Sequence, residues 1–195
     1  GPVGGLETIP SEFSHCYDLK NRILESVRRR MASLTHWNMG FRKRCRNANL
    51  ILCKTEITRQ YIPSEYADKA VLFTDVAADS TPYIYNKVGK DSDITEFITV
   101  GRLDAWRGFD LIIEAVEAAI RQHDRIHVTI LGEGSDRTRL ETLVREKSLD
   151  NYVSLPGKVS MDDYRKRMAE SDVVINAALK EGAVTVSFDA MAMGL

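Results

Sequence analysis

The sequence contains little cysteine, no long apolar run and no excess of charge of either sign. Its 195 residues include three cysteines, Cys16, Cys45 and Cys53, and none belongs to a CxxC pair. A disulfide framework and a structural zinc site are therefore not expected, and a reducing compartment, the cytoplasm, fits this composition best. No apolar run approaches the roughly 18–20 residues that a membrane-spanning helix needs.

The charges are balanced overall but unevenly distributed along the chain. Lysine and arginine number 27, aspartate and glutamate 28, and the formal net charge is -1. This balance disfavours a nucleic-acid-binding protein, in which basic residues are usually in excess. Residues 1–50, however, hold nine basic residues against four acidic ones, whereas residues 51–195 hold 18 against 24. The sequence predicts a basic first segment joined to an acidic body.

Apolar residues recur at steps of three and four over residues 19–34, which predicts an amphipathic helix. Its arginines lie outside the apolar stripe: Arg22, Arg28, Arg29 and Arg30. A solvated helix face is the commoner role of such a charge run, and contact with an anionic membrane at the inner face of the cell is the alternative. Around this helix we expect a loop over 1–18, strands over 49–53 and 71–73, and a short helix over 55–67.

From residue 95 onward, β-rich runs alternate four times with helical patterns. Strands are expected over 97–100, 127–131, 152–155 and 173–176, and helices over 111–120, 136–147, 161–170 and 184–193. This alternation is typical of an α/β fold, a Rossmann-like parallel sheet with flanking helices. Residues 74–95, which show little periodicity, are expected to form a linker.

The loops that follow the expected strands are the candidate binding loops, because ligands of open α/β sheets bind beyond the carboxyl ends of the strands. The first loop holds Gly101, Arg102 and Arg107 just before a helix. Guanidinium groups bind phosphate oxygens, and a helix start adds free N–H groups. The spacing alone fits two solvated loop arginines equally well.

The next two loops are weaker signals. Gly132-Glu133-Gly134 would let the backbone approach a ligand, but glycines also make tight turns. Lys158 and Val159 follow Pro156-Gly157, which fits an ordinary turn before a helix cap. For each of these loops taken alone, the turn is the favoured interpretation.

The fourth loop places acidic side chains and free N–H groups near one helix start. Glu181 lies in the loop and Asp189 within the helix, where each could accept hydrogen bonds from sugar hydroxyls. The N–H groups of Ala183, Val184 and Thr185 could hold a diphosphate. The alternative is an acid that simply complements the helix dipole. Together the four loops suit a nucleoside diphosphate-sugar.

Four ordered motifs in the second half carry a family resemblance: Gly101-Arg102-Leu103 with Arg107-Gly108, Gly132-Glu133-Gly134 with Leu140, Val153 to Val159, and Glu181 with Asp189. With them, residues 97–195 closely resemble the donor-binding domain of retaining GT-B glycosyltransferases of family 4, the "glycosyl transferases group 1" type. Three positions depart from the family pattern. Arg107 replaces a lysine, Asp189 replaces the second glutamate, and Val184 stands where many relatives have glycine.

The resemblance implies a role for each candidate residue. Arg102 and Arg107 would hold the donor diphosphate, assisted by N–H groups at 183–185, and Glu181 would be the catalytic group at the transferred sugar. Asp189 would contact the ribose, and the backbone at Lys158 and Val159 would face the base. The loops around Gly101, Gly132 and Glu133 would complete the donor site. No metal or other cofactor is expected, because positive side chains and helix dipoles stabilise the leaving diphosphate.

The resemblance further implies a hexosyltransferase that retains configuration, with a polysaccharide or glycolipid acceptor. Residues 1–73 would end the N-terminal, acceptor-side domain, 74–95 would be the linker, and 96–195 an incomplete donor-binding domain. Such a fragment is expected to be inactive alone and to self-associate through an unpaired sheet edge. A non-catalytic nucleotide-binding module is the alternative. A dinucleotide-dependent oxidoreductase is disfavoured because no GxGxxG follows an expected first strand.

Overall fold

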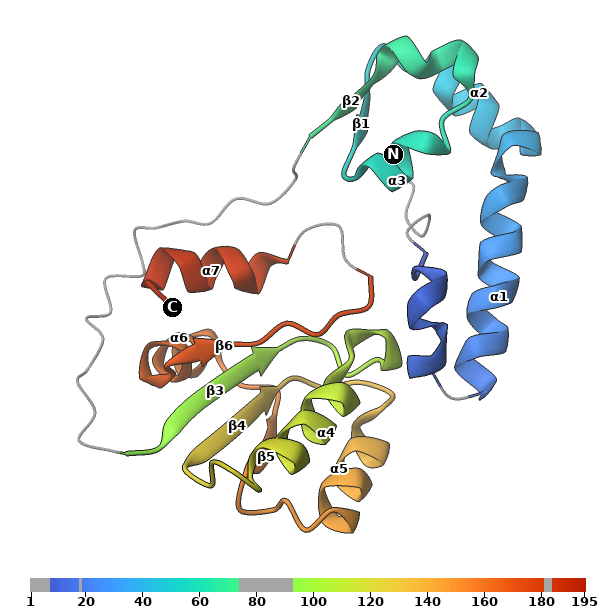
Figure 1. Cartoon of the computed structure of the whole chain (residues 1–195). Coiled ribbons are helices and arrows are strands. Elements are labelled where there is room, and N and C mark those ends of the chain that lie inside the picture. The colour runs from blue at the N-terminus through green and yellow to red at the C-terminus, as the bar shows by residue number, and fades with distance from the viewer. Residues whose placement is uncertain (1–7, 18, 74–92, 181–183) are drawn as a thin grey trace. The chain divides into compact units, whose positions relative to one another are not determined.

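The computed structural model describes residues 8–17, 19–73, 93–180 and 184–195, which fall into two compact units (Figure 1). Residues 8–73 form the body of the first unit, to which Lys180 and Val184 are also assigned. The second unit holds residues 93–179 and 185–195. Most of the predicted linker, residues 74–92, lies outside the described residues, and the first strand after it already begins at Thr95.

The first unit begins with helices. A 3₁₀-helix, η1, spans Ser11–Cys16 within the segment predicted to be a loop, so that prediction is wrong there. The helix α1 spans Leu19–Ser33, η2 spans Leu34–Trp37, and α2 spans Met39–Asn47. Asn38 ends one helix and starts the next, because its side chain accepts a hydrogen bond from the Phe41 N–H at 3.0 Å.

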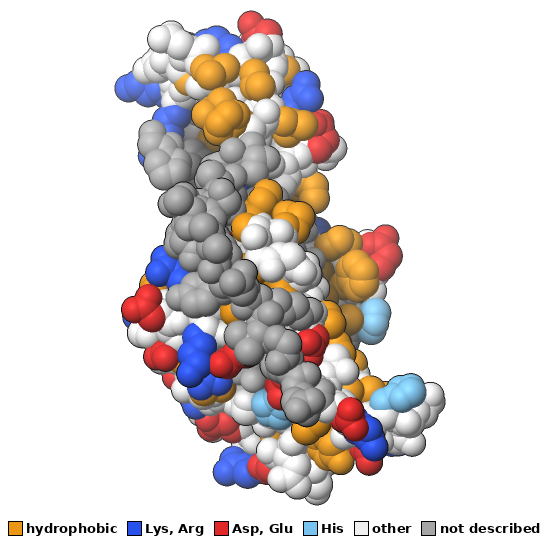
Figure 2. All heavy atoms as spheres, turned by 90° about the vertical axis from the view of Figure 1, so that its left-hand side faces the viewer, with side chains coloured by type: hydrophobic (Ala, Val, Ile, Leu, Met, Phe, Trp, Pro, Cys, Tyr) orange, Lys and Arg blue, Asp and Glu red, His pale blue; other side chains and the backbone are white. Residues whose placement is uncertain are grey.

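A two-stranded parallel sheet follows in the first unit. The strands β1, Ile51–Cys53, and β2, Ala70–Leu72, are joined by α3, Glu56–Gln60, and the 3₁₀-helix η3, Ser64–Lys69. The helix predicted over 55–67 is thus broken in two, because Pro63 offers no N–H to continue α3. Leu52 of β1 and Val71 of β2 are exposed. Figure 2 shows hydrophobic side chains at the surface of the first unit.

Cys45 and Cys53 belong to the small core of the first unit, with Phe41, Ile62 and Ala70. Burial raises the pKa of both thiols above the ordinary value, which keeps them protonated at neutral pH. A protonated thiol is a poor nucleophile. The structure therefore makes Cys53 a core residue of the first unit.

The second unit is an α/β fold built on a four-stranded parallel sheet, as predicted. Its strands are β3, Thr95–Val100, β4, Ile126–Leu131, β5, Val153–Gly157, and β6, Val173–Val174. The helices are α4, Phe109–Ala119, α5, Arg137–Glu146, α6, Met161–Glu170, and α7, Thr185–Met193. The short 3₁₀-helix η5, Ala105–Arg107, precedes α4.

Both faces of this sheet are covered, α4 and α5 lying on one side and α6 and α7 on the other (Figure 1). Successive side chains of a strand point to opposite faces, so the strands supply both cores. Val128 and Ile130 pack under α4 and α5, while Ile98 and Leu131 pack with Tyr164 and Met168 of α6. Ile98 and Met168 are completely buried.

The strand order of the sheet is β5-β4-β3-β6, so the chain reverses direction between β3 and β6. It first moves from β3 through β4 to β5, and then crosses back to place β6 on the other side of β3. The helices after β3 and β6 cover opposite faces, and the carboxyl ends of these two strands mark the point at which the strand order reverses. This position is where an open α/β sheet binds its ligand. The sequence had pointed to the loops but not to this pair of strands.

Candidate functional site

The candidate site is the edge of the second unit's sheet at which the carboxyl ends of its strands meet, here called the carboxyl edge. The loop after β3 begins at Gly101, whose N–H donates to the Leu131 carbonyl at 2.9 Å and so continues the β3–β4 pairing. Arg102 comes next, and 70% of its side chain is exposed. Its Nε donates to Asp104 at 2.5 Å, which fixes the base of the guanidinium and leaves the group open to an anion from solvent.

Arg107, the second predicted phosphate ligand, lies on the inner side of the same loop. Its guanidinium stacks on the ring of Trp106, 4.2 Å from the centroid. A Cβ atom on Gly101 would come within 3.6 Å of Arg107 Nε, so the side chain lies against the Gly101 backbone. Cation–π stacking orients a guanidinium without neutralising its charge. The structure thus places Arg102 and Arg107, the arginine pair, in the same loop at the end of β3.

The loops after β3 and β6 are in direct contact. The N–H of Leu179 donates to the Trp106 carbonyl at 2.9 Å. Gly108 has a φ of 68°, and a Cβ atom there would lie 2.2 Å from the Ala177 carbonyl oxygen. Only glycine fits this position, since both the backbone angle and the space exclude a side chain. The two loops that flank the reversal in strand order are therefore held together by backbone contacts.

The loop after β4 packs on the loop after β3 in the same manner. A Cβ atom on Gly132, whose φ is 141°, would lie 1.9 Å from the Gly101 carbonyl oxygen, and one on Gly134 would lie 2.3 Å from that of Leu103. The Leu103 N–H also donates to the Glu133 carbonyl at 2.9 Å. Gly132 thus allows close contact between two loops. The sequence had offered a tight turn, the favoured interpretation, or approach to a ligand.

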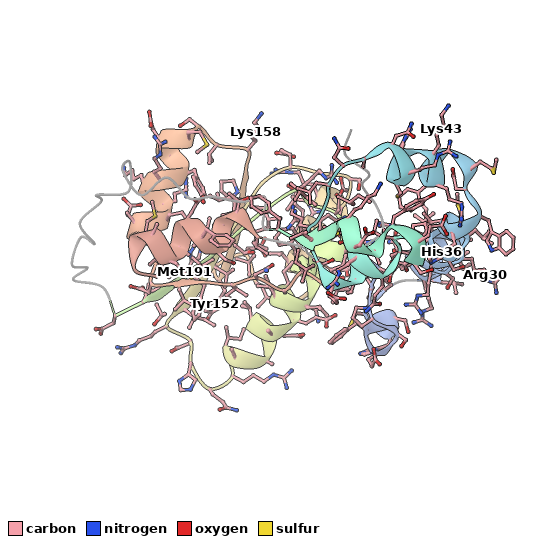
Figure 3. The ribbon with its side chains drawn as sticks, turned by 90° about the horizontal axis from the view of Figure 1, so that it is seen from above. Arg30, His36, Lys43, Tyr152, Lys158 and Met191 are labelled. Carbon is pink, nitrogen blue, oxygen red and sulfur yellow. The ribbon has the colours of Figure 1, made fainter. Side chains whose placement is uncertain are left out.

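The other predicted residues after β4 and β5 are Glu133, Lys158 and Val159. Glu133 forms an ion pair with Arg137 of α5, with Oε1 and Nη1 2.5 Å apart. Figure 3 shows the exposed side chain of Lys158 directed away from the ribbon, whereas Val159 packs in the core on the α6 side. The contact of Lys158 and Val159 with a base stays a prediction that concerns their backbone.

Asp189 is buried and bonded to a residue that sequence reasoning missed. Tyr164 of α6 donates a hydrogen bond from its hydroxyl to Asp189 Oδ2 at 2.6 Å, and the two residues are 8% and 7% exposed. A tyrosine on the covered face of an amphipathic helix needs such a partner, which is the signal that could have revealed the pair. The carboxylate is therefore directed at α6, and its predicted contact with a ribose stays a prediction.

The remaining predicted residues belong to the start of α7. Glu181 and Ala183 lie outside the described residues. Thr185 is the first residue of α7 and Val184 precedes it, so their N–H groups lie among those that an α-helix leaves unbonded at its start. Val184 is assigned to the first unit, so of these two N–H groups that of Thr185 belongs to the same unit as the carboxyl edge.

The next feature is the position of His127 and of possible metal ligands. His127 contacts Glu96 at 2.8 Å near the amino ends of β3 and β4, the opposite edge of the sheet from the arginine pair. Among residues 8–17, 19–73, 93–180 and 184–195, no group of three or more His, Cys, Asp and Glu is placed to hold a metal ion. Nor is any helix of these segments both long and apolar enough to cross a membrane.

Comparison with known proteins gives one family. Its model, described as glycosyl transferases group 1, matches residues 82–195, more than half of the chain. The chain is also similar to a putative colanic acid biosynthesis glycosyltransferase, WcaL, of Salmonella typhimurium, with 22% identity over 83% of this chain and 42% of that protein. A phosphatidylinositol N-acetylglucosaminyltransferase subunit from Arabidopsis thaliana is 24% identical over 61% of this chain and 27% of its own length. The chain thus spans less than half the length of these curated relatives.

The fold matches solved GT-B glycosyltransferases. One is the pneumococcal O-GlcNAc transferase GtfA, crystallised with UDP and GlcNAc. It superposes with a TM-score of 0.60 at 18% identity, and the match covers 79% of this chain and 30% of that one. The second unit is therefore an α/β domain of the GT-B type, as the sequence resemblance had implied.

Replacing Gly132 by alanine is expected to destabilise the second unit by at least about 3 kcal/mol, since the new Cβ atom would collide with the Gly101 carbonyl. Chemical denaturation followed by circular dichroism measures the change. Gly101→Ala is the matched control, because its Cβ atom would meet its nearest neighbours at ordinary contact distance, 3.5 Å or more. Equal stability of the two variants would contradict the assigned contact.

Replacing Tyr164 by phenylalanine is expected to cost about 1.5–3 kcal/mol, the usual value of a hydrogen bond to a charged group. The buried Asp189 carboxylate would have one donor fewer. Tyr152→Phe is the control, since this half-buried ring packs against the core through its apolar atoms. If both variants unfold at the same denaturant concentration as the unaltered protein, the Tyr164–Asp189 bond does not stabilise the fold.

Proposed function

Because the chain belongs to the glycosyl transferases group 1 family, we propose that it supplies the nucleotide-sugar-binding part of a hexosyltransferase. The enzyme transfers a sugar from a nucleoside diphosphate-sugar to an acceptor hydroxyl, with retention of configuration. The observation that supports this most is the arginine pair at the end of β3, next to the reversal of strand order. A diphosphate is the part of such a donor that two guanidinium groups recognise.

The arginines also suit the chemistry of the transfer. When the bond between the sugar and the diphosphate breaks, negative charge grows on the leaving phosphate oxygen. Arg102 and Arg107, together with the N–H groups that begin α7, stabilise this charge without a metal ion. Their positions are fixed before the substrate binds, one by Asp104 and the other by Trp106. Preorganised charges of this kind cost no rearrangement in the transition state.

The acidic residues are assigned to contacts with the transferred sugar and the ribose. Glu181 contacts the transferred hexose, and Asp189 is placed near the ribose. The short Asp189 side chain is held by Tyr164, so a bridging water is the simplest link from this carboxylate to a ribose hydroxyl. Lys158 and Val159 present their backbone to the base.

The relatives suggest which molecules react. The GtfA structure contains UDP and GlcNAc, which supports a UDP-sugar as the donor. The relatives' names refer to phosphatidylinositol and to colanic acid, which supports a glycolipid or polysaccharide acceptor. We assign the reaction to the cytoplasm, in keeping with three free cysteines. The 195-residue chain alone is expected to be inactive, and the short edge strand β6 offers a route to self-association.

A nucleotide-binding module without catalysis is the second candidate. The burial of Asp189 favours it, because a carboxylate directed at Tyr164 is less available to a substrate. The two candidates differ in turnover: a transferase slowly releases UDP from its donor even without an acceptor, whereas a binding module does not. Release of UDP from a panel of UDP-sugars by the longer parent protein distinguishes them.

Replacing Arg102 or Arg107 by alanine is expected to weaken UDP binding about tenfold or more, since each variant loses charge-assisted hydrogen bonds to phosphate. Isothermal titration calorimetry measures the affinity. Arg125→Ala is the matched control: this arginine is 69% exposed in its side chain and ion-paired to an aspartate, like Arg102, but lies just before β4 at its amino end. The control is expected to bind UDP as the unaltered protein does. Unchanged affinity in the Arg102 and Arg107 variants would remove the arginine pair from the site.

A further inference from the structure

Asp189 is a buried acid on the covered side of α7. Val186 and Met193, three residues before it and four after it, lie on the same side of the helix and pack against the core on the α6 side of the sheet. Asp189 is 7% exposed, so its carboxylate lies at this core rather than in solvent. A carboxylate in such a place requires a hydrogen-bond donor, because burying an unpaired charge is strongly unfavourable.

Tyr164 supplies that donor from within the protein. Its hydroxyl donates to Asp189 Oδ2 at 2.6 Å, and the tyrosine is itself 8% exposed. The two residues belong to α6 and α7, which lie on the same side of the sheet (Figure 1). Because the protein itself makes this bond, the carboxylate does not depend on a ligand hydroxyl for its hydrogen bond.

The Tyr164–Asp189 bond affects how well a site distinguishes ligands that differ by one hydroxyl. A site that binds a hydroxyl directly rejects the analogue that lacks it, because a desolvated protein group is then left without a partner. At Asp189 this penalty does not arise, since Oδ2 keeps its bond to Tyr164 with either ligand. A water that bridges the carboxylate and a hydroxyl binds another water when the hydroxyl is absent, so it adds little discrimination.

We propose that the donor site of this chain accepts 2-deoxyribose as readily as ribose, so that 2′-deoxyribonucleoside diphosphate-sugars are among its donors. Tyr164 sets this tolerance, because it holds the acid that is assigned to the ribose. The inference rests on the proposed function, in which a nucleoside diphosphate binds at the carboxyl edge with its ribose near Asp189. Asp189 lies roughly 6 Å along the helix axis from Thr185, the first residue of α7, and so stays close to the helix start that is proposed to hold the diphosphate.

Isothermal titration calorimetry of the 195-residue chain tests the proposal with UDP, 2′-deoxy-UDP and 2′,3′-dideoxy-UDP. These ligands share the base and the diphosphate and differ only in the ribose hydroxyls. Their dissociation constants are expected to agree within about threefold, since only water-mediated contacts change. A direct hydrogen bond from a ribose hydroxyl to the carboxylate would instead separate them by about tenfold or more.

Tyr164→Phe is expected to create the discrimination that the unaltered chain lacks. Without the tyrosine hydroxyl the buried carboxylate needs another donor, and a ribose hydroxyl is a donor that UDP has and 2′,3′-dideoxy-UDP lacks. The ratio of the dideoxy-UDP to the UDP dissociation constant is therefore expected to rise about fivefold or more. A merely structural role of Tyr164 would lower all affinities together and leave this ratio unchanged.

Tyr152→Phe is the matched control, since this half-buried ring packs against the other core of the second unit. Its ratio of dissociation constants is expected to equal that of the unaltered chain. Circular dichroism establishes that both variants are folded. If Tyr164→Phe does not fold, the ratio measured on the unaltered chain decides alone.

Two results would overturn this inference and leave the proposed function standing. The first is UDP binding with a dissociation constant about tenfold or more below that of either deoxy analogue in the unaltered chain. The second is a folded Tyr164→Phe variant whose ratio equals that of the unaltered chain. If none of the three nucleotides binds to the folded chain, the proposed function is overturned together with the inference.

Discussion

The close packing of loop backbones at the carboxyl edge is the constraint on which the rest of the second unit depends. Gly132 lies against the Gly101 carbonyl, and Gly108 lies against the Ala177 carbonyl, at distances that admit no side chain. These contacts join the loops after β4 and β6 to the loop after β3. The packing therefore requires glycine at these positions. The same contacts hold the loop after β3 in place, and this loop carries Arg102 and Arg107.

The order of the strands determines which loops are neighbours at the carboxyl edge. Because β6 lies beside β3, the loop that carries Arg102 and Arg107 adjoins the loop that leads into α7. We propose that the two arginines and the N–H groups at the start of α7 serve one phosphate site, although they are separated by about 80 residues in the chain. Membership in the glycosyl transferases group 1 family supports a diphosphate as its ligand.

Much of the second unit could be predicted from the sequence, because its apolar runs and helical periods are regular and its loops are short. The position of β6 could not, since strand order depends on the helix α6 crossing to the other face of the sheet. Nor could the bond between Tyr164 and Asp189, which joins residues on two different helices. The sequence assigned Asp189 by motif spacing alone, and spacing does not determine which way a side chain points.

In the first unit, the sequence predicted a helix but not its orientation. Helical periodicity identified the apolar stripe of α1 correctly, but periodicity does not reveal which side of a helix is covered. Two hydrogen bonds determine which side of α1 is covered: Arg29 donates to the Ile9 carbonyl, and Glu25 accepts from the Ile9 N–H. Ile9 lies in a segment predicted to be a loop. An amphipathic helix was thus predictable, whereas its orientation was not.

The central claim is that a nucleoside diphosphate binds where the loops after β3 and β6 meet. Amide chemical-shift mapping of the isotope-labelled chain during titration with UDP tests it directly. The account predicts shifts concentrated at residues 101–108, at 177–179 and at Thr185, with little change near Arg125 and His127 at the amino ends of the strands. Shifts confined to those amino ends, or no shifts at saturating UDP, would contradict it.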